Sequence, residues 1–369
     1  MNENYSQNIN MESIKITLKN IDKIIINFKL DQIIFDKSEL GETEQERIDY
    51  NLYANARKYP KVKDFVINLA NNGFYMTAHS QGISTFSSIS NIDKFSELAK
   101  IKKQRFNNIF FDLELLNTNE KKQNLLVIFS SVADFPYNAD ISRRNFFPNF
   151  KSIYKYIPYN TNILRISDIG GVVGSFYLNN NFNLQVESNI QTLLKKIATD
   201  LSIAKENIVL YGVSKGGTAS LYHGILGGYK CVAVDPIVCD EYHQKKHQDS
   251  HFTIGTFPES KKEKFKQLMN QNIHENVNII YSKNSPIFKD IESIIKSNDK
   301  YKKINYFNIE HPKIKDHPDV GPNTINILML IINNLFYEFY KKKTNKKNTK
   351  VLKFYISKFK KKLKIIFNF

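Results

Sequence analysis

Tryptophan is absent from this chain of 369 residues, and cysteine and glycine are scarce, with two and fourteen copies. Two cysteines are too few for a disulfide framework, so Cys231 and Cys239 indicate a reducing compartment. The first residues show no basic segment followed by an apolar one, so no secretory signal is visible. No run of about 18 apolar residues occurs, which argues against a membrane-spanning helix. We therefore expect a cytoplasmic protein.

Acidic residues are absent from residues 341–369, a tail that holds twelve lysines and so supplies twelve of the seventeen excess positive charges. Because most of the excess lies in a tail and not in a groove, we expect no nucleic-acid partner. If the tail is helical, its large apolar residues fall on one face and its lysines mostly on the other. This pattern favours peripheral binding to an anionic membrane surface, with a solvated terminus or a helix packed on a partner as alternatives. The predicted membrane-binding residues are Lys350, Lys353, Phe359, Lys361 and Leu363.

One G-x-S-x-G pentapeptide, residues 212–216, stands between an apolar run and a helical stretch. Residues 208–211 predict a buried strand, and residues 218–226 predict a helix. Glycines on both sides of Ser214 permit a turn sharp enough to lift the serine hydroxyl above the sheet and over a helix N-terminus. A chance glycine turn is the alternative, but the flanking strand and helix favour a nucleophile.

Strand-like and helical stretches alternate from about residue 105 onward, which predicts the α/β class with a doubly wound, mostly parallel sheet. The expected strands are residues 106–116, 125–129, 162–166, 208–211, 231–234, 277–281 and 304–309. The expected helices are residues 186–201, 218–226 and 323–340.

The N-terminal part has a different pattern: a strand at residues 14–18, a helix at 60–72 and a hairpin at 73–86. We therefore expect an N-terminal α+β module whose function the sequence leaves open. The predicted organisation is this module at residues 1–104, a catalytic domain at 105–340 and a Lys-rich amphipathic helix at 341–369.

The order of elements around the pentapeptide resembles the α/β-hydrolase fold over residues 105–340. The turn at residues 168–175, Asp-Ile-Gly-Gly-Val-Val-Gly-Ser, is similar to the D-x-x-G-x-G-x-S turn of many such enzymes. The resemblance implies a serine enzyme whose acid and base follow the nucleophile in the chain. It predicts no cofactor.

The resemblance implies that the base follows the last strand, where His311 and His317 both stand. His317 is favoured because it is closer to the start of the next helix. The acid stays open between Asp235, at the end of the strand after the elbow helix, and Asp290, in the next such loop. A Ser–His dyad is a third interpretation, because Asn284 or Ser285 occupies the usual acid position.

Two backbone N–H groups should form an oxyanion hole for the developing alkoxide. The first is that of Lys215, directly after the nucleophile. The second should follow the strand at residues 125–129, where Ser130 and Ser131 stand.

Histidines spaced by four, His243, His247 and His251, would share one face of a helix. Three imidazoles could bind zinc, but neighbouring charged residues make a solvated helix equally natural. The segment lies where hydrolase folds insert lids, so we expect His243 and His247 to contact substrate or to belong to a lid. We expect no resident metal.

The sequence around the elbow, YGVSKGGTASLYHG, together with an extra N-terminal module and a basic tail, resembles capsular polysaccharide biosynthesis proteins of the XcbB/CpsF type. A weaker likeness is to glycan O-acetyltransferases of bacterial accessory secretion systems. These resemblances imply O-acetyl transfer or ester hydrolysis on a surface polysaccharide or its precursor, in contact with a capsule biosynthesis complex. They indicate no acyl donor. A carboxylesterase or lipase, and a non-catalytic assembly or export factor on a hydrolase scaffold, are the alternatives.

Overall fold

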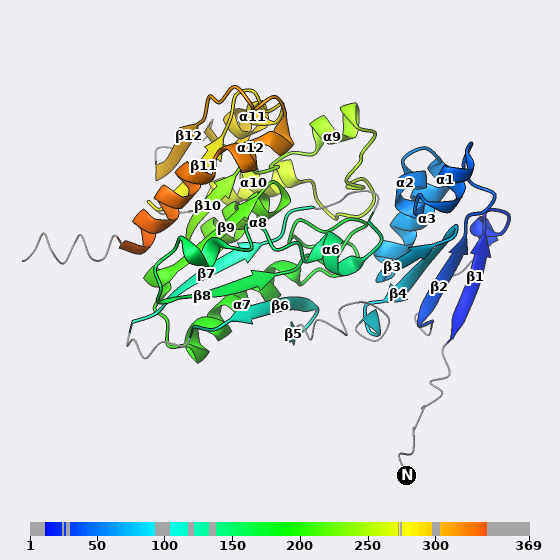
Figure 1. Ribbon diagram of the computed structural model, residues 1–369, viewed down its shortest axis with the longest axis horizontal. Helices are drawn as coiled ribbons and strands as arrows, with labels where there is room; N and C mark the ends of the chain where they lie inside the picture. Colours follow the sequence, from blue (N-terminus) through cyan, green and yellow to red (C-terminus); the bar gives the residue numbers. More distant parts are fainter. Residues whose placement is uncertain are drawn as a thin grey trace, which may run out of the picture.

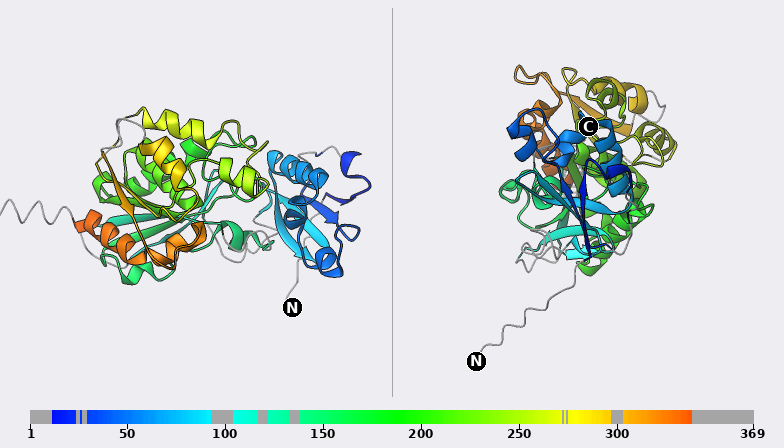
Figure 2. Two further views of the ribbon diagram at one scale, coloured as in Figure 1. Left: turned by 90° about the horizontal axis from the view of Figure 1, so that it is seen from above. Right: turned by 90° about the vertical axis from the view of Figure 1, so that its right-hand side faces the viewer.

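Two sheets lie side by side in this protein (Figures 1 and 2). The computed structural model describes residues 12–23, 26, 30–92, 104–116, 122–132, 138–271, 273, 275–296 and 303–337. A four-stranded sheet near the N-terminus, drawn in blue, sits at one end of a larger unit built on an eight-stranded sheet.

The large sheet has the strand order β12-β11-β10-β9-β7-β8-β6-β5. Its strands are parallel except that β6 runs antiparallel to β8, and β5 antiparallel to β6. This order, with a crossover that exchanges β7 and β8, is that of the α/β-hydrolase fold, so the predicted fold class is confirmed. The strands are β5 (Gln104–Phe106), β6 (Ile109–Glu114), β7 (Asn124–Phe129), β8 (Thr161–Ile166), β9 (Ile208–Val213), β10 (Lys230–Val234), β11 (Val277–Tyr281) and β12 (Ile304–Asn308).

Helices cover both faces of this sheet, which is why its central strands are buried along almost their whole length and are mostly apolar. On one face Val127 of β7 shares a core with Leu193 and Leu221. On the other face Ile128 shares a core with Leu328 of the helical residues 325–337. The helices that matter for the site are α7 (Val186–Asp200), α8 (Lys215–Gly227), α9 (Glu241–Lys246), α10 (Lys261–Met269) and α12 (His317–Asn323).

Two expected elements differ from those observed. The single strand expected at residues 106–116 is a hairpin of β5 and β6, which turns at Asn107 with a φ of 52°. Asparagine tolerates this left-handed conformation, so the chain can turn there without a glycine or proline. The sequence therefore carried no strong turn signal within a largely apolar run. The helix expected at residues 323–340 is preceded by α12, and the two are separated at Thr324.

The small sheet has the order β1-β2-β4-β3, with one parallel pair, β1 and β2. Its β3–β4 hairpin matches the one expected from the sequence, and α3 matches the expected helix. The elements are β1 (Ser13–Thr17), β2 (Gln32–Asp36), α1 (Glu44–Ile48), α2 (Leu52–Ala56), α3 (Pro60–Asn71), β3 (Phe74–Ser80) and β4 (Ile83–Ser88).

The two units are joined by a hydrophobic cluster to which both contribute. Phe110, Val172 and Phe252 of the larger unit are buried in the cluster that the small sheet forms with α3. The fully buried Arg144, from helix α6 (Ile141–Asn145), donates from Nη2 to the carbonyl oxygen of Met76 in β3 at 2.8 Å. The N-terminal strands are thus packed directly against the larger unit.

Among the residues that the structure describes, no helix is long and apolar enough to cross a membrane. The tail at residues 341–369 lies outside the described residues, and with it all five predicted membrane-binding residues. Membrane binding through this tail stays a prediction.

Candidate active site

The pentapeptide forms the turn between β9 and α8. Ser214 has a φ of 56°, in the left-handed region that costs a non-glycine residue conformational energy. A Cβ atom on Gly212 would lie 2.1 Å from the carbonyl oxygen of Gly216, and one on Gly216 would lie 2.3 Å from that of Phe129. Both glycines are therefore required by close backbone approach, and the strained turn sits where a nucleophile is expected.

Three polar side chains meet at the carboxyl ends of the strands. Ser214 follows β9, Asp235 follows β10, and His317 begins α12 after β12. The Oγ atom of Ser214 lies 2.7 Å from Nε2 of His317, and Nδ1 of His317 lies 2.7 Å from Oδ2 of Asp235. Since a carboxylate only accepts, Nδ1 carries the proton and Nε2 is free to accept that of Ser214. This is the arrangement of a Ser–His–acid triad.

Asp235 is fully buried and is held by its surroundings. Its backbone N–H donates to Ile280 of β11, and its φ is 44°. The Oγ atom of Ser285 donates to Oδ2 at 2.6 Å, the same oxygen that faces His317. The residue at the usual acid position thus supports the carboxylate instead of supplying it.

His317 is fixed by the start of α12. Asp316 is the N-cap of this helix, and Asp319 completes a reciprocal capping box with it. Because the cap fixes the first helical residue, the imidazole is held between Ser214 and Asp235.

The alternatives for acid and base are not brought to the serine. Asp290 is half-buried in α11 (Phe288–Asp290), where burial and then Glu241 raise the pKa of its carboxyl. His311 accepts the N–H of Lys313 at Nδ1, two residues along its own loop. The expectation for Asp290 is corrected, because Asp235 occupies the position beside the imidazole.

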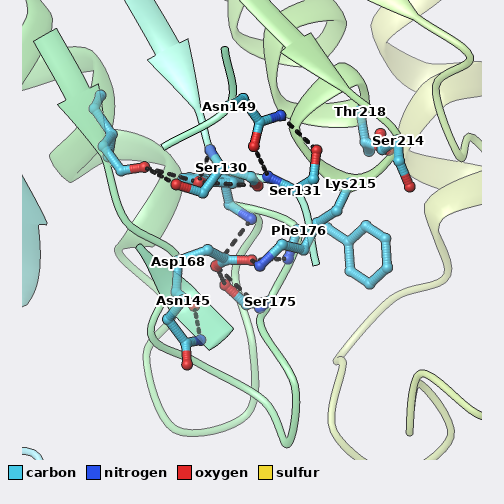
Figure 3. Close-up of polar contacts among 12 residues, drawn as sticks. Ser130, Ser131, Asn145, Asn149, Asp168, Ser175, Phe176, Ser214, Lys215 and Thr218 are labelled. Atoms are coloured by element: carbon cyan, nitrogen blue, oxygen red, sulfur yellow. Dashed lines mark hydrogen bonds and ion pairs between the residues drawn. The ribbon is translucent and has the colours of Figure 1, made fainter. Parts of the chain in front are cut away.

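The predicted oxyanion donors after β7 are engaged within the protein. Figure 3 shows Ser131 facing Asn149, whose Oδ1 accepts the Ser131 N–H at 3.1 Å while its Nδ2 donates to the Ser131 Oγ at 2.6 Å. The Ser130 N–H donates to the Tyr177 hydroxyl at 2.6 Å. Ser130 is therefore not available in this conformation, and Ser131 becomes available only if the Asn149 amide turns away. Lys215 keeps its N–H at the N-terminus of α8.

The side chain of Lys215 forms a buried ion pair that the sequence analysis missed. Its Nζ lies 3.0 Å from Oδ2 of Asp168, and both side chains are almost fully buried (Figure 3). Asp168 also accepts three backbone N–H groups and the Ser175 hydroxyl. Burial lowers the pKa of Lys215, and the Asp168 carboxylate opposes this shift. The pair ties the residue after the nucleophile to the glycine-rich turn at residues 168–175.

The histidines of the expected lid lie near the triad. The rings of His243 and His317 are 6.3 Å apart, and those of His243 and His251 are 4.2 Å apart. Burial, then the neighbouring His317, lowers the pKa of His243 to about 3. His247 packs beside His243, with ring centroids 6.0 Å apart. Within the described part of the chain, no group of three or more His, Cys, Asp or Glu residues is arranged to hold a metal ion.

A pocket of about 620 Å³ opens over Ser214. Ser214 is half-buried, so it can be reached from this pocket. Among the described residues that line it, none is a lysine, an arginine or a carboxylate. It consists of Ser131, Val132, Phe147, Asn149, Phe150, Tyr211, Val213, Ser214, His251, His317, Pro318, Gly321, Pro322 and Ile325. A neutral, partly apolar pocket suits an uncharged acyl group.

Comparison with known proteins finds similar structures at low sequence identity. No family model matches the chain, and no curated protein matches it in sequence. A chain of the glycosylation-associated protein complex from Streptococcus agalactiae is 15% identical, with a TM-score of 0.48, over 70% of this chain and 51% of that one. This chain thus spans about half the length of that protein.

Two further solved structures are similar. The capsule O-acetyltransferase of Neisseria meningitidis serogroup A is 16% identical, with a TM-score of 0.46, over 63% of this chain and 94% of that one. A fluorophosphonate-binding serine hydrolase of Staphylococcus aureus is 11% identical, with a TM-score of 0.41, over 61% and 92%. At these identities the likeness concerns the fold alone.

Proposed function

We propose that this chain catalyses serine-dependent acyl transfer, with Ser214 as nucleophile, His317 as base and Asp235 as the acid that orients it. The observation that carries the proposal is the unbroken line of two 2.7 Å contacts from Ser214 through His317 to Asp235. The serine also stands at the N-terminus of α8, where the helix dipole favours negative charge. A reachable hydroxyl with a base on one side and the N–H of Lys215 on the other has the main parts that covalent catalysis needs, and the Ser131 N–H would add a second donor if Asn149 turned away.

The reaction proceeds in two halves. Ser214 Oγ bonds to the acyl carbon while its proton passes to His317 Nε2, and Asp235 stabilises the resulting imidazolium. The N–H of Lys215 donates to the oxyanion. The bond to the leaving group then breaks, and the leaving group takes the proton from His317. An acceptor oxygen repeats the sequence: its proton passes to His317 as it bonds to the acyl carbon. The bond from the acyl carbon to Ser214 Oγ then breaks, and Ser214 recovers the proton from His317.

The finer part of the proposal is the substrate. We infer a surface or capsular polysaccharide, or its precursor, as the substrate or acceptor, because residues 211–224, together with an extra N-terminal module and a basic tail, resemble capsular polysaccharide biosynthesis proteins. The neutral lining of the pocket is compatible with a sugar hydroxyl and an uncharged acyl group. The acyl donor is left open.

The decisive experiment replaces the nucleophile. Ser214→Ala should abolish labelling by a fluorophosphonate probe and should lower acyl transfer by a factor of about 10⁶, since triad members act as a unit. Circular dichroism and urea unfolding control for the fold. Labelling or transfer that survives in Ser214→Ala contradicts the proposal, and a wild-type protein that resists the probe favours a non-catalytic scaffold.

A carboxylesterase or lipase acting on small or lipid esters is the second candidate. The exposed side chains of Phe147 and Ile325 line the pocket and favour an apolar substrate. Hydrolysis of p-nitrophenyl esters at rates that added glycan leaves unchanged would support this candidate. Transfer of the acyl group to the glycan would support the first.

The partner surface is proposed from the charge pattern alone. We propose that residues 341–369 hold the protein to an anionic bilayer at the cytoplasmic face. Deleting the tail should abolish sedimentation with anionic vesicles and leave ester hydrolysis intact. Unchanged sedimentation of the deleted form contradicts the anchor.

A further inference from the structure

A second imidazole, His251, lines the pocket that contains Ser214 and His317. It comes from the segment between α9 and α10, and its ring packs against Phe176 with centroids 5.5 Å apart. The two-step chemistry proposed above assigns this residue no role.

The ring nitrogens of His251 lack hydrogen-bond partners among the described residues. Nδ1 is buried without a partner. Nε2 also has no partner among the described residues but is not one of the buried atoms that lack a partner, so it is open to the pocket or to solvent. Burial and then the neighbouring His243 hold the pKa of His251 well below its ordinary value, so the ring is neutral. A buried nitrogen tolerates an unused lone pair better than an unused N–H. The proton therefore belongs on Nε2, where it can be donated to a group in the pocket.

The backbone around His251 is held in a costly conformation. Gln248, Asp249 and Phe252 all have φ values between 52° and 54°, in the left-handed region. The buried carboxylate of Asp249 accepts the Thr253 N–H at 2.8 Å and the Ile254 N–H at 3.1 Å. Such a turn persists only where its surroundings fix it, and here it fixes the position of His251.

The N-terminal unit supplies part of that support. Lys63 of α3 lies 3.4 Å from the Asp249 carboxylate and donates to the Gln248 carbonyl oxygen at 3.0 Å. Asn71, at the end of the same helix, donates to the carbonyl oxygen of Gly255 at 2.9 Å. Helix α3 thus contacts both ends of the turn that carries His251.

We propose that His251 is a substrate-binding residue that positions the oxygen of the acyl acceptor, and that α3 holds it in place through Lys63. In the second half of the reaction, the acceptor oxygen accepts a hydrogen bond from His251 Nε2–H while its own proton passes to His317. The bond from that oxygen to the acyl carbon forms, and the bond to Ser214 breaks. This inference rests on the proposed function and gives the N-terminal unit a part in it.

The test separates the two halves of the reaction. The full chain is acetylated with p-nitrophenyl acetate, and decay of the acetyl-enzyme is followed by intact-protein mass spectrometry in buffer and in buffer with glycerol. His251→Phe should keep its acetylation rate within about twofold and slow the decay about tenfold, the effect of one lost hydrogen bond. His251→Gln, which keeps a donor, should recover most of the decay rate.

The two acceptors distinguish the source of the oxygen. Loss of the glycerol effect alone assigns the site to an alcohol, and slower decay in both buffers assigns it to water as well. Unchanged decay in both, or an equal loss of acetylation and decay, overturns the proposal. A wild-type enzyme that takes up no acetyl group instead contradicts the proposed function.

Two matched variants on α3 test its role in holding His251. Lys63→Met should slow decay of the acetyl-enzyme about threefold without changing acetylation. Lys61→Met, on the same helix, removes only an exposed ion pair with Asp22 and should change neither. Equal effects of the two variants, or no effect of Lys63→Met, overturn the part assigned to α3.

Discussion

Two imidazoles line one pocket and differ in the hydrogen-bond partners of their ring nitrogens. His317 has a partner at both ring nitrogens, Asp235 and Ser214, and its position is set by a capped helix. His251 has a partner at neither among the described residues, and its position is set by a turn that the N-terminal unit supports. The first site is complete without a ligand, whereas the second is completed only by one. A covalent step needs a base that is oriented in advance, and an acceptor site must stay open.

The largest expected effect follows from replacing Asp235, the partner of His317 at Nδ1. Asp235→Asn should lower kcat for ester hydrolysis by a factor of about 10⁴, because an amide favours the wrong imidazole tautomer while preserving the geometry. The measurement is steady-state hydrolysis of p-nitrophenyl acetate, with urea unfolding as the control for stability. A loss smaller than about tenfold would mean that His317 does not depend on Asp235.

The elements of the triad differed in how far the sequence could define them. Ser214 was predictable because its strand, glycines and helix are adjacent in the chain. His317 was predictable from chain order and its place near a helix start. The acid stayed open between Asp235 and Asp290, because the choice depends on which loop end meets the imidazole across the sheet.

The sequence predicted more of the fold than of the site. Apolar runs alternating with amphipathic stretches predicted the large sheet, since buried parallel strands are mostly apolar. The contacts of Asn149 with Ser131 and of Lys215 with Asp168 join residues far apart in the chain, and no local pattern marks them. One signal was present in the sequence: Lys215 lies inside the elbow, beside helix positions that must be buried. A buried lysine there could have indicated an internal carboxylate as its partner.

The next largest effect is on stability and concerns the buried ion pair of Lys215 and Asp168, beside the nucleophile. Asp168→Asn should lower the free energy of unfolding by about 3–5 kcal/mol, since it leaves the buried Lys215 without a counter-charge. Lys215→Met should cost less, because Asp168 keeps its backbone N–H donors and the Ser175 hydroxyl. Urea unfolding measures both. A larger loss in Lys215→Met than in Asp168→Asn would contradict this order.

The smallest expected effect concerns His243, and it is a change in how stability depends on pH. His243 has a folded-state pKa of about 3 against an ordinary value of 6.5, chiefly because it is buried. Below pH 6.5 the unfolded chain binds a proton that the folded chain refuses, so His243 lowers stability as the pH falls from 6.5 towards 3, and not above.

Replacing this imidazole should therefore flatten the acid side of the stability profile. His243→Phe should reduce the slope by about 1.4 kcal/mol per pH unit between pH 6 and 4.5, a total of about 2 kcal/mol. Urea unfolding at a series of pH values measures the slope, and Tyr242→Phe, beside His243 and without a group that titrates in acid, should leave it unchanged. An unaltered slope in His243→Phe would mean that this ring is hydrated and able to take up a proton, contrary to what its buried Nδ1, without a partner among the described residues, indicates.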